Sequence, residues 1–362
     1  MASRSGREWG AQMSAGRRPT MADVAARAGV SVSTVSLTYS GAGPISPDMK
    51  ARVERAAQEL GYAGPSPQAR ALRSGRTHIV GLVVHDRLQL ALRDPFTLGV
   101  LDALIGDLGE MGLGVLWLPS PPPEPTEPTL LDTAPMDAAV VMRVRDHDEP
   151  ALEILARRGV PVAIVEGKAP GAASITIDDT TATRELIEHL ISLGHKRIGT
   201  ITLPRDSDRE TVVVTDDMLS GTSWTPTKHR LRAFAEAGIE PCVIVESRTS
   251  ALQEGIDAGH LALTHESRPT ALVCQSDLLA AGAVLAARER GLRVPEDVSI
   301  TGFDGIDLAW LEPEKLTTVL QDGPAKGHLI AQAVRDLLDG GAAPVLQLPL
   351  AMRIGTTTGP AA

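Results

Sequence analysis

The sequence has few aromatic residues, only two cysteines and no long apolar run. Aromatic residues make up 2% of its 362 residues, so any hydrophobic core must be aliphatic. Cys242 and Cys274 are too few to cross-link a chain of this length and have no metal-ligand spacing, which indicates a reducing compartment. No apolar stretch of the kind that a secretory signal needs occurs before Val30, and no run of about 18 uncharged apolar residues occurs that could span a membrane. We therefore expect a cytoplasmic protein without a membrane partner.

Basic residues are outnumbered by acidic ones, and their distribution is uneven. A formal net charge of −10 argues by itself against a nucleic-acid partner, because phosphate binding needs Lys and Arg. Residues 1–77, however, contain eleven basic and five acidic residues, a net charge of +6, whereas residues 78–362 carry −16. A basic head before an acidic body is typical of a DNA-binding module joined to another function. A merely solvated charged surface is the alternative at this point.

The head has the pattern of a helix-turn-helix. Thr20 and Asp23 have the spacing of a capping box, which predicts the start of a helix, and Gly29 predicts its end. Ser31 predicts the N-cap of a second helix, and a third is expected at about 46–60. The residues expected to form a small core are Val24, Ala25, Ala28, Val35, Val53, Ala56, Ala57 and Leu60. In a helix-turn-helix the second helix enters the major groove of DNA.

From His78 onward, strand and helix patterns alternate. Short apolar runs are typical of buried parallel strands. The predicted strands are 79–84, 114–118, 138–142, 162–165, 174–177, 197–202, 242–246, 271–274 and 298–301, and the predicted helices are 96–111, 150–158, 183–193, 229–237 and 277–290. Two such series predict two doubly wound α/β lobes, with a ligand between them at the carboxyl ends of the strands.

The sequence contains no motif of an enzyme. It has no Walker loop, no Gly-x-Ser-x-Gly elbow and no metal motif. Asp178 and Asp179 are adjacent carboxylates, but neighbours in a strand face opposite sides and cannot act as a catalytic pair. His189 and His195 have a spacing that fits a helix end rather than a triad. We expect no catalytic residue, no metal and no cofactor.

Short motifs in the head, the hinge and the body follow one consistent order. In the head and hinge they are Asp23-Val24-Ala25, Ala28-Gly29-Val30-Ser31, Thr34-Val35-Ser36, Leu60-Gly61-Tyr62 and residues 69–75 (Ala-Arg-Ala-Leu-Arg-Ser-Gly). In the body they are residues 94–96, 177–179, 188–190, 193–195, 276–282 and 291–304, the last reading Gly-Leu-Arg-Val-Pro-Glu-Asp-Val-Ser-Ile-Thr-Gly-Phe-Asp. Together they resemble the lactose-repressor (LacI/GalR) family of bacterial transcription regulators, over residues 20–357.

The resemblance implies an all-α helix-turn-helix headpiece followed by an α/β body of two doubly wound, periplasmic-binding-protein-like lobes. The expected domains are a disordered arm at 1–19, the headpiece at 20–62, a hinge at 63–77 and an effector-binding and dimerisation body at 78–362. Within the body, lobe 1 is expected at about 78–190 and 306–321, and lobe 2 at about 191–305 and 322–362.

The resemblance places DNA contacts on the second helix of the head. The base-reading positions hold Val32, Ser33 and Leu37, and the third of these is commonly Arg in the family. Leucine cannot make the bidentate contact of Arg to guanine, so we expect Val32 and Leu37 to pack on thymine methyl groups and the operator to differ there. A core position for Leu37 is the alternative. Further DNA contacts, mainly to phosphates, are expected at Thr20, Ser31, Thr34 and Ser36.

The hinge is expected to fold only on DNA. Residues 68–73 predict one and a half helical turns, which are marginal alone. Leu72 matches the leucine that the family wedges into the minor groove, and Ala69 matches the small residue at which two hinge helices pack. Arg73 adds positive charge. The spacing before Leu72 is one residue longer than usual, and a flexible linker is the alternative.

Effector contacts are also implied by the resemblance. Asp304 matches the strand-end carboxylate that accepts ligand hydroxyls, and Arg230 best fits the cleft arginine, with Arg232 as its rival. A carboxylate with a guanidinium suits polyols. As alternatives, Asp304 and Asp277 are structural caps and Arg230 is an exposed helix residue. The remaining expected contacts are Phe96, Thr97, Ser276 (which replaces a frequent Asn) and Asp277.

Two departures from the family pattern concern the pocket. Residues 203–227 are longer than the usual segment and are expected to cover or reshape it, and no aromatic residue occurs near 247–250, where relatives often place a stacking ring. The sequence therefore predicts a ligand-responsive regulator, most simply a repressor. Its expected partners are a palindromic double-stranded DNA operator, a sugar-like small-molecule effector and a second copy of the chain. The alternative is a solute-binding protein without DNA function, which the basic head opposes.

Overall fold

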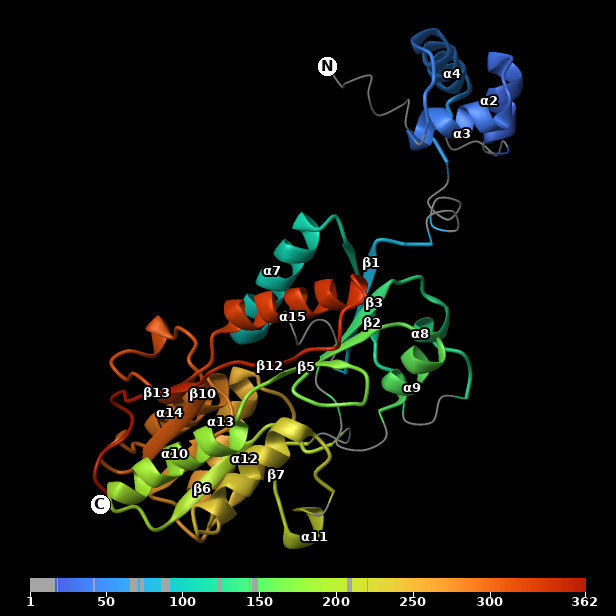
Figure 1. The fold of residues 1–362 in the computed structure, drawn as a ribbon. Helices are drawn as coiled ribbons and strands as arrows, with labels where there is room; N and C mark the ends of the chain where they lie inside the picture. The colour runs from blue at the N-terminus through green and yellow to red at the C-terminus, as the bar shows by residue number, and fades with distance from the viewer. Residues whose placement is uncertain are drawn as a thin grey trace, which may run out of the picture. The chain divides into compact units, whose positions relative to one another are not determined.

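The chain divides into two units, residues 1–77 and 78–362. Figure 1 shows their elements. The computed structural model describes residues 17, 19–41, 43–65, 71, 75–85, 92–122, 126–142, 144, 149–206, 210–219 and 221–362. The predicted arm at 1–19 lies outside the described residues except for residues 17 and 19, and the predicted hinge helix lies outside them except for residue 71.

The described part of the first unit contains three helices, α2 (Met21–Ala28), α3 (Val32–Ser40) and α4 (Pro47–Leu60). The Thr20 hydroxyl accepts a hydrogen bond from the amide of Asp23, and the Asp23 carboxylate accepts one from the amide of Thr20, which confirms the capping box. Gly29 ends α2 with φ 64°, in the left-handed region. The helices enclose the predicted aliphatic core, whose fully buried members include Val24, Val35 and Val53.

Lobe 1 of the body is built on a parallel six-stranded sheet in the order β12-β5-β4-β3-β1-β2. Its strands are β1 (Ile79–Val84), β2 (Gly114–Pro119), β3 (Ala138–Met142), β4 (Val162–Val165), β5 (Ala173–Thr176) and β12 (Val345–Gln347). Its helices are α7 (Pro95–Glu110), α8 (Leu130–Thr133), α9 (Pro150–Arg157) and α15 (Gly323–Leu338). Successive strand residues face opposite sides, so Leu82 packs with α7 and α15 while Val83 packs with α8 and α9.

Lobe 2 is built on a seven-stranded sheet in the order β13-β11-β10-β9-β6-β8-β7, in which β7 and β13 are antiparallel to their neighbours. Its strands are β6 (Ile198–Thr202), β7 (Val212–Val213), β8 (Ile244–Glu246), β9 (Ala271–Cys274), β10 (Ser299–Asp304), β11 (Thr317–Leu320) and β13 (Ala351–Arg353). Its helical segments are α10 (Asp179–Ser192), α11 (Asp216–Leu219), α12 (Thr225–Glu236), α13 (Leu252–Thr264), α14 (Asp277–Glu289) and η1 (Ala309–Leu311).

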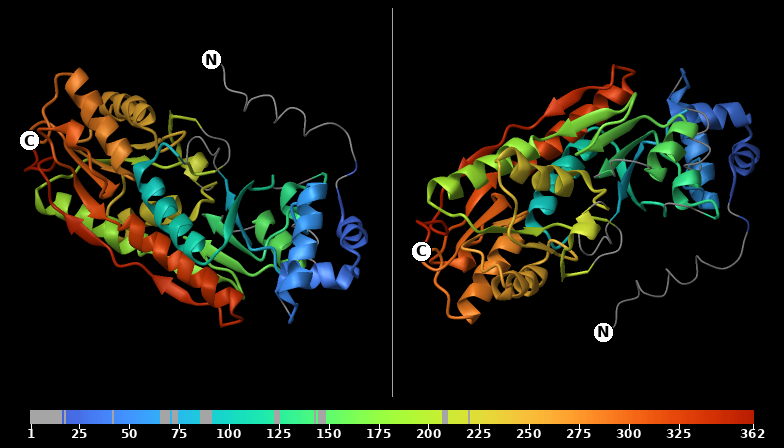
Figure 2. Two further views of the ribbon diagram at one scale, coloured as in Figure 1. Left: turned by 90° about the horizontal axis from the view of Figure 1, so that it is seen from above. Right: turned by 90° about the horizontal axis from the view of Figure 1, so that it is seen from below.

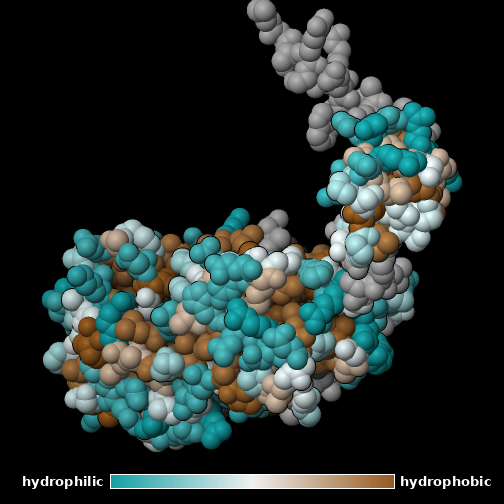
Figure 3. Space-filling model, turned by 45° about the horizontal axis from the view of Figure 1, so that its top comes forward, coloured by the Kyte–Doolittle hydropathy of each residue, from teal (hydrophilic) through white to brown (hydrophobic). Residues whose placement is uncertain are grey.

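Helices α13 and α14 approach each other closely at a pair of glycines. A Cβ atom on Gly282 would lie 2.4 Å from the carbonyl carbon of Gly255, a distance that side chains do not tolerate. The two helices cover one face of the second sheet, while α10 and α12 cover the other. The aliphatic side chains are thus used inside the lobes, and the face of the body seen in Figure 3 shows hydrophobic residues scattered among hydrophilic ones.

The predicted boundaries between the two lobes are wrong in both the first and the second segment of each lobe. Residues 306–321 contain β11, which pairs with β10 of lobe 2, and residues 322–362 contain α15, which packs beside α7 of lobe 1 (Figure 1, Figure 2). Strand β12 likewise pairs with β5 of lobe 1, and α10 belongs to lobe 2. The chain therefore passes between the lobes after β5, after β11 and after β12, because strand pairing rather than sequence order decides lobe membership.

The described residues were also compared with two expectations from the sequence, the absence of a membrane span and the absence of a metal site. In that part of the chain, no helix has both the length and the apolar composition to cross a membrane. The same residues contain no cluster of three or more His, Cys, Asp or Glu side chains arranged to hold a metal ion. Cys242 and Cys274 are free thiols, the second fully buried.

Candidate DNA-binding surface and effector cleft

Helix α3 presents apolar side chains to solvent at the predicted base-reading positions. Val32 is 47% exposed and Leu37 is 37% exposed, whereas Val35 between them is fully buried in the headpiece core. Leu37 rests against Gly43, at which a Cβ atom would lie 3.3 Å from the Leu37 Cδ2 atom. Leu37 is therefore a surface residue, and the alternative of a core position is wrong. Ser33 is exposed on the same turn as Val32.

The start of α3 carries a cluster of hydroxyl groups. The Ser31 Oγ atom accepts a hydrogen bond from the amide of Thr34 at 3.1 Å and lies 2.8 Å from the Thr34 hydroxyl and 2.7 Å from the Ser33 hydroxyl. No acidic residue occupies the first turn of this helix. A helix start with amide and hydroxyl donors and no carboxylate is suited to a phosphate group.

Of the other predicted DNA contacts, the structure describes Thr20 and Ser36 but not the three hinge residues. The Thr20 hydroxyl is engaged with the Asp23 carboxylate at 2.7 Å, and this contact lowers the pKa of Asp23. Ser36 is half-buried on α3. Ala69, Leu72 and Arg73 lie outside the described residues, so their role in the hinge stays a prediction.

A small cavity of about 80 Å³ lies between the two lobes of the body, where five of the six predicted effector residues meet. Lobe 1 contributes the start of α7 and Glu166 after β4, and lobe 2 contributes the ends of β9 and β10 and the start of α12. This is the expected place at the carboxyl ends of the strands. The predicted residues that line it are Phe96, Thr97, Arg230, Ser276 and Asp304.

Arg230 is held inside the cavity wall by a buried ion pair. Its Nε donates to the Asp179 Oδ1 atom at 2.7 Å, its Nη1 donates to the Gln275 carbonyl, and its guanidinium carbon lies 3.5 Å from the centre of the Phe303 ring. Arg230 and Asp179 are each 3% exposed, so the alternative of an exposed helix residue is wrong. The rival Arg232 is exposed, pairs with Glu236 and does not line this cavity.

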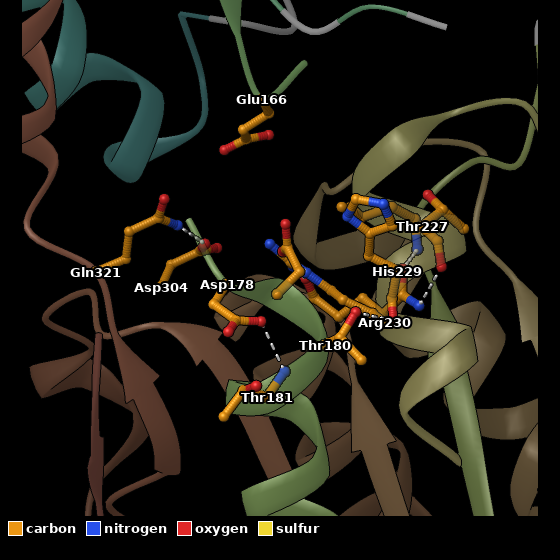
Figure 4. Close-up of polar contacts among 12 residues, drawn as sticks. Glu166, Asp178, Thr180, Thr181, Thr227, His229, Arg230, Asp304 and Gln321 are labelled. Atoms are coloured by element: carbon orange, nitrogen blue, oxygen red, sulfur yellow. Dashed lines mark hydrogen bonds and ion pairs between the residues drawn. The ribbon is translucent and has the colours of Figure 1, made fainter. Parts of the chain in front are cut away.

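Asp178 and Asp179 do not lie in a strand, contrary to the expectation from the sequence. Asp178 is the N-cap of α10, and its side chain accepts a hydrogen bond from the amide of Thr181 at 3.0 Å (Figure 4). Asp179 is the first residue of that helix and points inward to Arg230. Each carboxylate therefore has its own structural partner, the Thr181 amide for Asp178 and Arg230 for Asp179.

Asp304 combines backbone strain with a perturbed carboxyl group. Its φ of 115° lies in a region that L-residues rarely adopt, and such strain persists where surrounding contacts impose it, often at ligand sites. Its Oδ1 accepts a hydrogen bond from the Gln321 Nε2 at 3.2 Å, with Glu166 across the same opening (Figure 4). Burial raises the pKa of Asp304 well above its usual value, although Arg230 opposes this.

A buried lysine that was not predicted from the sequence lines the same cavity as Asp304. Lys326 of α15 is 1% exposed, and its Nζ contacts the Glu166 carboxylate and the Gln321 Oε1 atom, the latter at 2.7 Å. It also lies 5.4 Å from the centre of the Phe96 ring. The sequence feature that could have identified it is its position on the apolar face of a helix, four residues before the buried Ile330.

Asp277 does not contact the cavity, so its predicted role in effector binding is wrong. Its Oδ1 accepts a hydrogen bond from the Thr318 hydroxyl at 2.5 Å, and its Oδ2 accepts one from the amide of Ile306 at 2.9 Å. A Cβ atom on Gly302 would lie 2.2 Å from its Oδ1, so glycine makes room for the carboxylate. Burial raises the pKa of Asp277 to about 7. The residue ties α14 to β10 and β11, as the structural alternative proposed.

A larger cavity of about 400 Å³ adjoins the small one and is lined by both lobes. The long segment 203–227 borders it through Leu203 and Pro204, and its expected role in reshaping the pocket stays a prediction. The same segment reaches lobe 1, because the Trp224 ring packs edge-on against His85 at 4.7 Å between centres. The Thr225 hydroxyl also donates to the carbonyl of Val144 at 3.1 Å.

The long segment 203–227 is anchored to lobe 2 by a second buried ion pair. The Arg205 amide donates to the Glu246 Oε1 at 2.8 Å, and its Nε donates to the Oε2 at 2.9 Å. The amide of Ser223 in turn donates to the Arg205 carbonyl at 2.9 Å. The segment 203–227 therefore contacts lobe 2 through Arg205 and lobe 1 through Trp224 and Thr225.

Comparison with known proteins agrees with both units. Residues 20–65 match the model of the bacterial regulatory proteins of the lacI family, and residues 187–358 match that of the periplasmic binding protein-like domain. An HTH-type transcriptional regulator of Mycolicibacterium smegmatis is 33% identical over 362 residues, which covers 96% of this chain and 98% of the relative.

Solved structures of similar fold span nearly the whole chain. The lac repressor dimer bound to operator and the anti-inducer ONPF is 24% identical with a TM-score of 0.70, covering 95% of this chain and 100% of that one. A complex of the transcriptional regulator CelR with cellobiose is 26% identical with a TM-score of 0.61, covering 94% and 100%. The predicted fold class and family are confirmed, and the relatives are regulators rather than enzymes. The chain belongs to the lacI family of bacterial transcription regulators.

Proposed function

We propose that this regulator is a repressor that binds a palindromic operator as a homodimer in the cytoplasm, and that a hydroxylated, sugar-like effector in the interlobe cleft controls the binding. The observation that carries the proposal is the meeting of Phe96 and Thr97 of lobe 1 with Arg230, Ser276 and Asp304 of lobe 2 around one cavity. A ligand that contacts both walls binds the closed arrangement of the lobes more tightly than an open one, and so shifts the equilibrium between them.

The cavity walls supply the hydrogen bonds that a polyol needs. Asp304 and Gln321 present carboxyl and amide groups from lobe 2, and Lys326 and Thr97 present ammonium and hydroxyl groups from lobe 1. Effector and operator must be coupled reciprocally, because each changes the affinity for the other by the same factor. The solved relative in complex with cellobiose supports a carbohydrate-like ligand class for this cleft.

The exposed apolar side chains of α3 support direct reading of DNA bases. Val32 and Leu37 have the position and the chemistry to contact thymine methyl groups, and the hydroxyl cluster at Ser31 has the chemistry to hold a phosphate. A homodimer with two-fold symmetry presents two such helices to the two halves of a palindrome. The solved lac repressor is a dimer on its operator, which supports this arrangement.

Selection of bound duplexes from a random DNA pool tests the proposal. The full-length protein is expected to enrich a two-fold symmetric site whose affinity falls steeply with salt. A panel of neutral sugars and polyols is then added to the selected site, and at least one is expected to change operator affinity about tenfold, within the usual range of allosteric coupling. Failure to enrich any symmetric site would refute the repressor proposal and favour a solute-binding protein.

A further inference from the structure

The chain has two tyrosines, and they contact each other in the headpiece. Tyr39 lies in the last turn of α3, and Tyr62 follows the end of α4. Their ring centres are 5.6 Å apart and their planes make an angle of 81°, the edge-to-face arrangement that aromatic pairs prefer. In a chain with 2% aromatic residues, both tyrosines therefore join the helix that is predicted to read DNA bases to the segment that leaves the headpiece.

Backbone hydrogen bonds fix the departing chain only as far as Tyr62. Gly61 ends α4 with φ 66°, and the amide of Tyr62 donates to the carbonyl of Ala57 at 2.8 Å. Among the described residues, no hydrogen bond between backbone groups holds residues 63–65. Gly64 has φ 107°, in the left-handed region where glycine is free to turn. The direction in which the chain leaves the headpiece therefore depends on side-chain packing.

The Tyr39 ring packs on this departing segment. A Cβ atom on Gly64 would lie 3.7 Å from both the Cδ1 and the Cε1 atoms of Tyr39, and apart from chain neighbours no other described residue comes within 4 Å of that point. The Tyr39 side chain is 37% exposed, so it lies outside the buried core formed by Val24, Val35 and Val53. Its removal is therefore expected to release Gly64 while leaving that core intact.

The geometry points to Tyr39 as a positioning residue that fixes the direction of the departing chain relative to α3, and thereby the spacing of the two operator half-sites. This inference rests on the proposed function, because it presumes two headpieces on one palindrome. In a two-fold dimer the half-site spacing mirrors the placement of the two recognition helices.

A change of spacing demands a movement of the headpiece. One helical turn of about 34–36 Å contains 10–10.5 base pairs, so a shift of one base pair moves a half-site by about 3.4 Å and turns it by about 35°. A headpiece held through Gly64 resists this movement, whereas a headpiece released from Tyr39 can turn about the glycine.

Operators with altered half-site spacing test the proposal on the full-length protein. Fluorescence anisotropy compares the symmetric site selected from the random pool with copies spaced one base pair wider or narrower, and with a single half-site. The unaltered protein is expected to bind the altered spacings at least about tenfold more weakly than the selected one. Tyr39→Ala is expected to reduce this ratio to about threefold or less, with the affinity for the single half-site unchanged within about twofold.

Tyr39→Phe is the matched control, because it keeps the ring and removes only the hydroxyl group. It is expected to retain the spacing ratio of the unaltered protein. A general loss of headpiece folding, which circular dichroism detects, would instead weaken binding to the single half-site and to every spacing alike, and so leave the ratio unchanged.

Fluorine-19 resonances test the ring contact directly. Because the chain has only two tyrosines, protein labelled with 3-fluorotyrosine gives two resonances, and Tyr39→Phe identifies the one that belongs to Tyr62. Tyr39→Ala is expected to shift the Tyr62 resonance, since it removes the neighbouring ring, whereas Tyr39→Phe is expected to leave it nearly unchanged.

Three results would overturn the inference. They are an unchanged spacing ratio in Tyr39→Ala, an equal loss of that ratio in Tyr39→Phe, which would assign the effect to the hydroxyl group, and an unmoved Tyr62 resonance in Tyr39→Ala. Failure to select any symmetric site would refute the proposed function and this inference with it. A symmetric site whose spacing all three proteins hold equally would refute this inference alone.

Discussion

Replacement of Arg230 by alanine is expected to destabilise the body strongly, because it leaves a buried carboxylate without its cation. The Arg230 and Asp179 side chains are 4% and 3% exposed, and the Nε and Oδ1 atoms are 2.7 Å apart. The same guanidinium also donates to the Gln275 carbonyl and lies over the Phe303 ring. Its removal therefore takes away the charge partner, a hydrogen-bond donor and a packing contact together.

The expected magnitude follows from the burial. Breaking a buried ion pair by removing one partner costs about 3–5 kcal/mol, because the remaining charge stays uncompensated. For Arg230→Ala we expect a value in the middle of that range, about 4 kcal/mol. Replacing both partners by apolar residues of similar volume removes the charge as well, so the double variant Asp179→Leu/Arg230→Met is expected to lie within about 2 kcal/mol of the original protein.

Urea unfolding of the full-length protein, followed by circular dichroism, measures these differences. Arg232→Ala is the matched control, since Arg232 lies two residues away on the same helix and forms an exposed ion pair with Glu236. An exposed pair contributes at most about 1 kcal/mol. The reasoning would be refuted if Arg230→Ala cost no more than Arg232→Ala, or if the double variant were less stable than Arg230→Ala.

Three further predictions concern the headpiece, a buried histidine and the helix contact of lobe 2. Leu37→Arg is expected to move the selected operator base towards guanine with a discrimination of about 1–3 kcal/mol, and Leu37→Ala to remove the preference for thymine; an unchanged selected sequence in both variants would contradict this. Burial lowers the pKa of His195, so the unfolded state takes up a proton first and stability should fall as the pH drops below about 6.5. His195→Gln should flatten this dependence in urea titrations between pH 8 and 5; an equal slope in both proteins would argue against it. Gly282→Ala should lower stability by about 3 kcal/mol or more, because its Cβ would overlap the backbone of Gly255. Gly106→Ala, where nothing lies within 4 Å, should raise stability by about 0.5–1 kcal/mol, and similar unfolding curves for the two variants would disprove the close packing.

The headpiece could be predicted in detail because its signals are local. The capping box of Thr20 and Asp23 and the left-handed Gly29 act within one turn of chain, so the sequence places the helix ends within a residue of the observed ones. Nine strands of the body were also predicted, since buried parallel strands are continuous apolar runs, whereas β7, β11, β12 and β13 were not predicted. Helix starts were predicted less well: α10 begins at Asp179 and α12 at Thr225, four residues before the expected starts, because their first turns are polar.

Parts of the effector cleft required the tertiary structure. Arg230 and Asp304 lie in recognisable motifs, but Lys326 and Glu166 are separated by 160 residues and meet only because α15 returns to lobe 1. Asp277 sits beside the cleft residue Ser276 in sequence, yet its carboxylate points into lobe 2 to Thr318. Sequence adjacency cannot reveal the direction of a side chain at a helix start.

The division follows from the range of the interactions. Capping, turn formation and the alternation of buried and exposed residues depend on neighbours a few positions away, and these specify the headpiece, the α/β elements and the family. The pairing of β11 with β10 and of β12 with β5 depends on segments that fold back across the body, and it decides which residues belong to each lobe. The larger cavity of the cleft likewise arises only when both lobes contribute their side chains to one space.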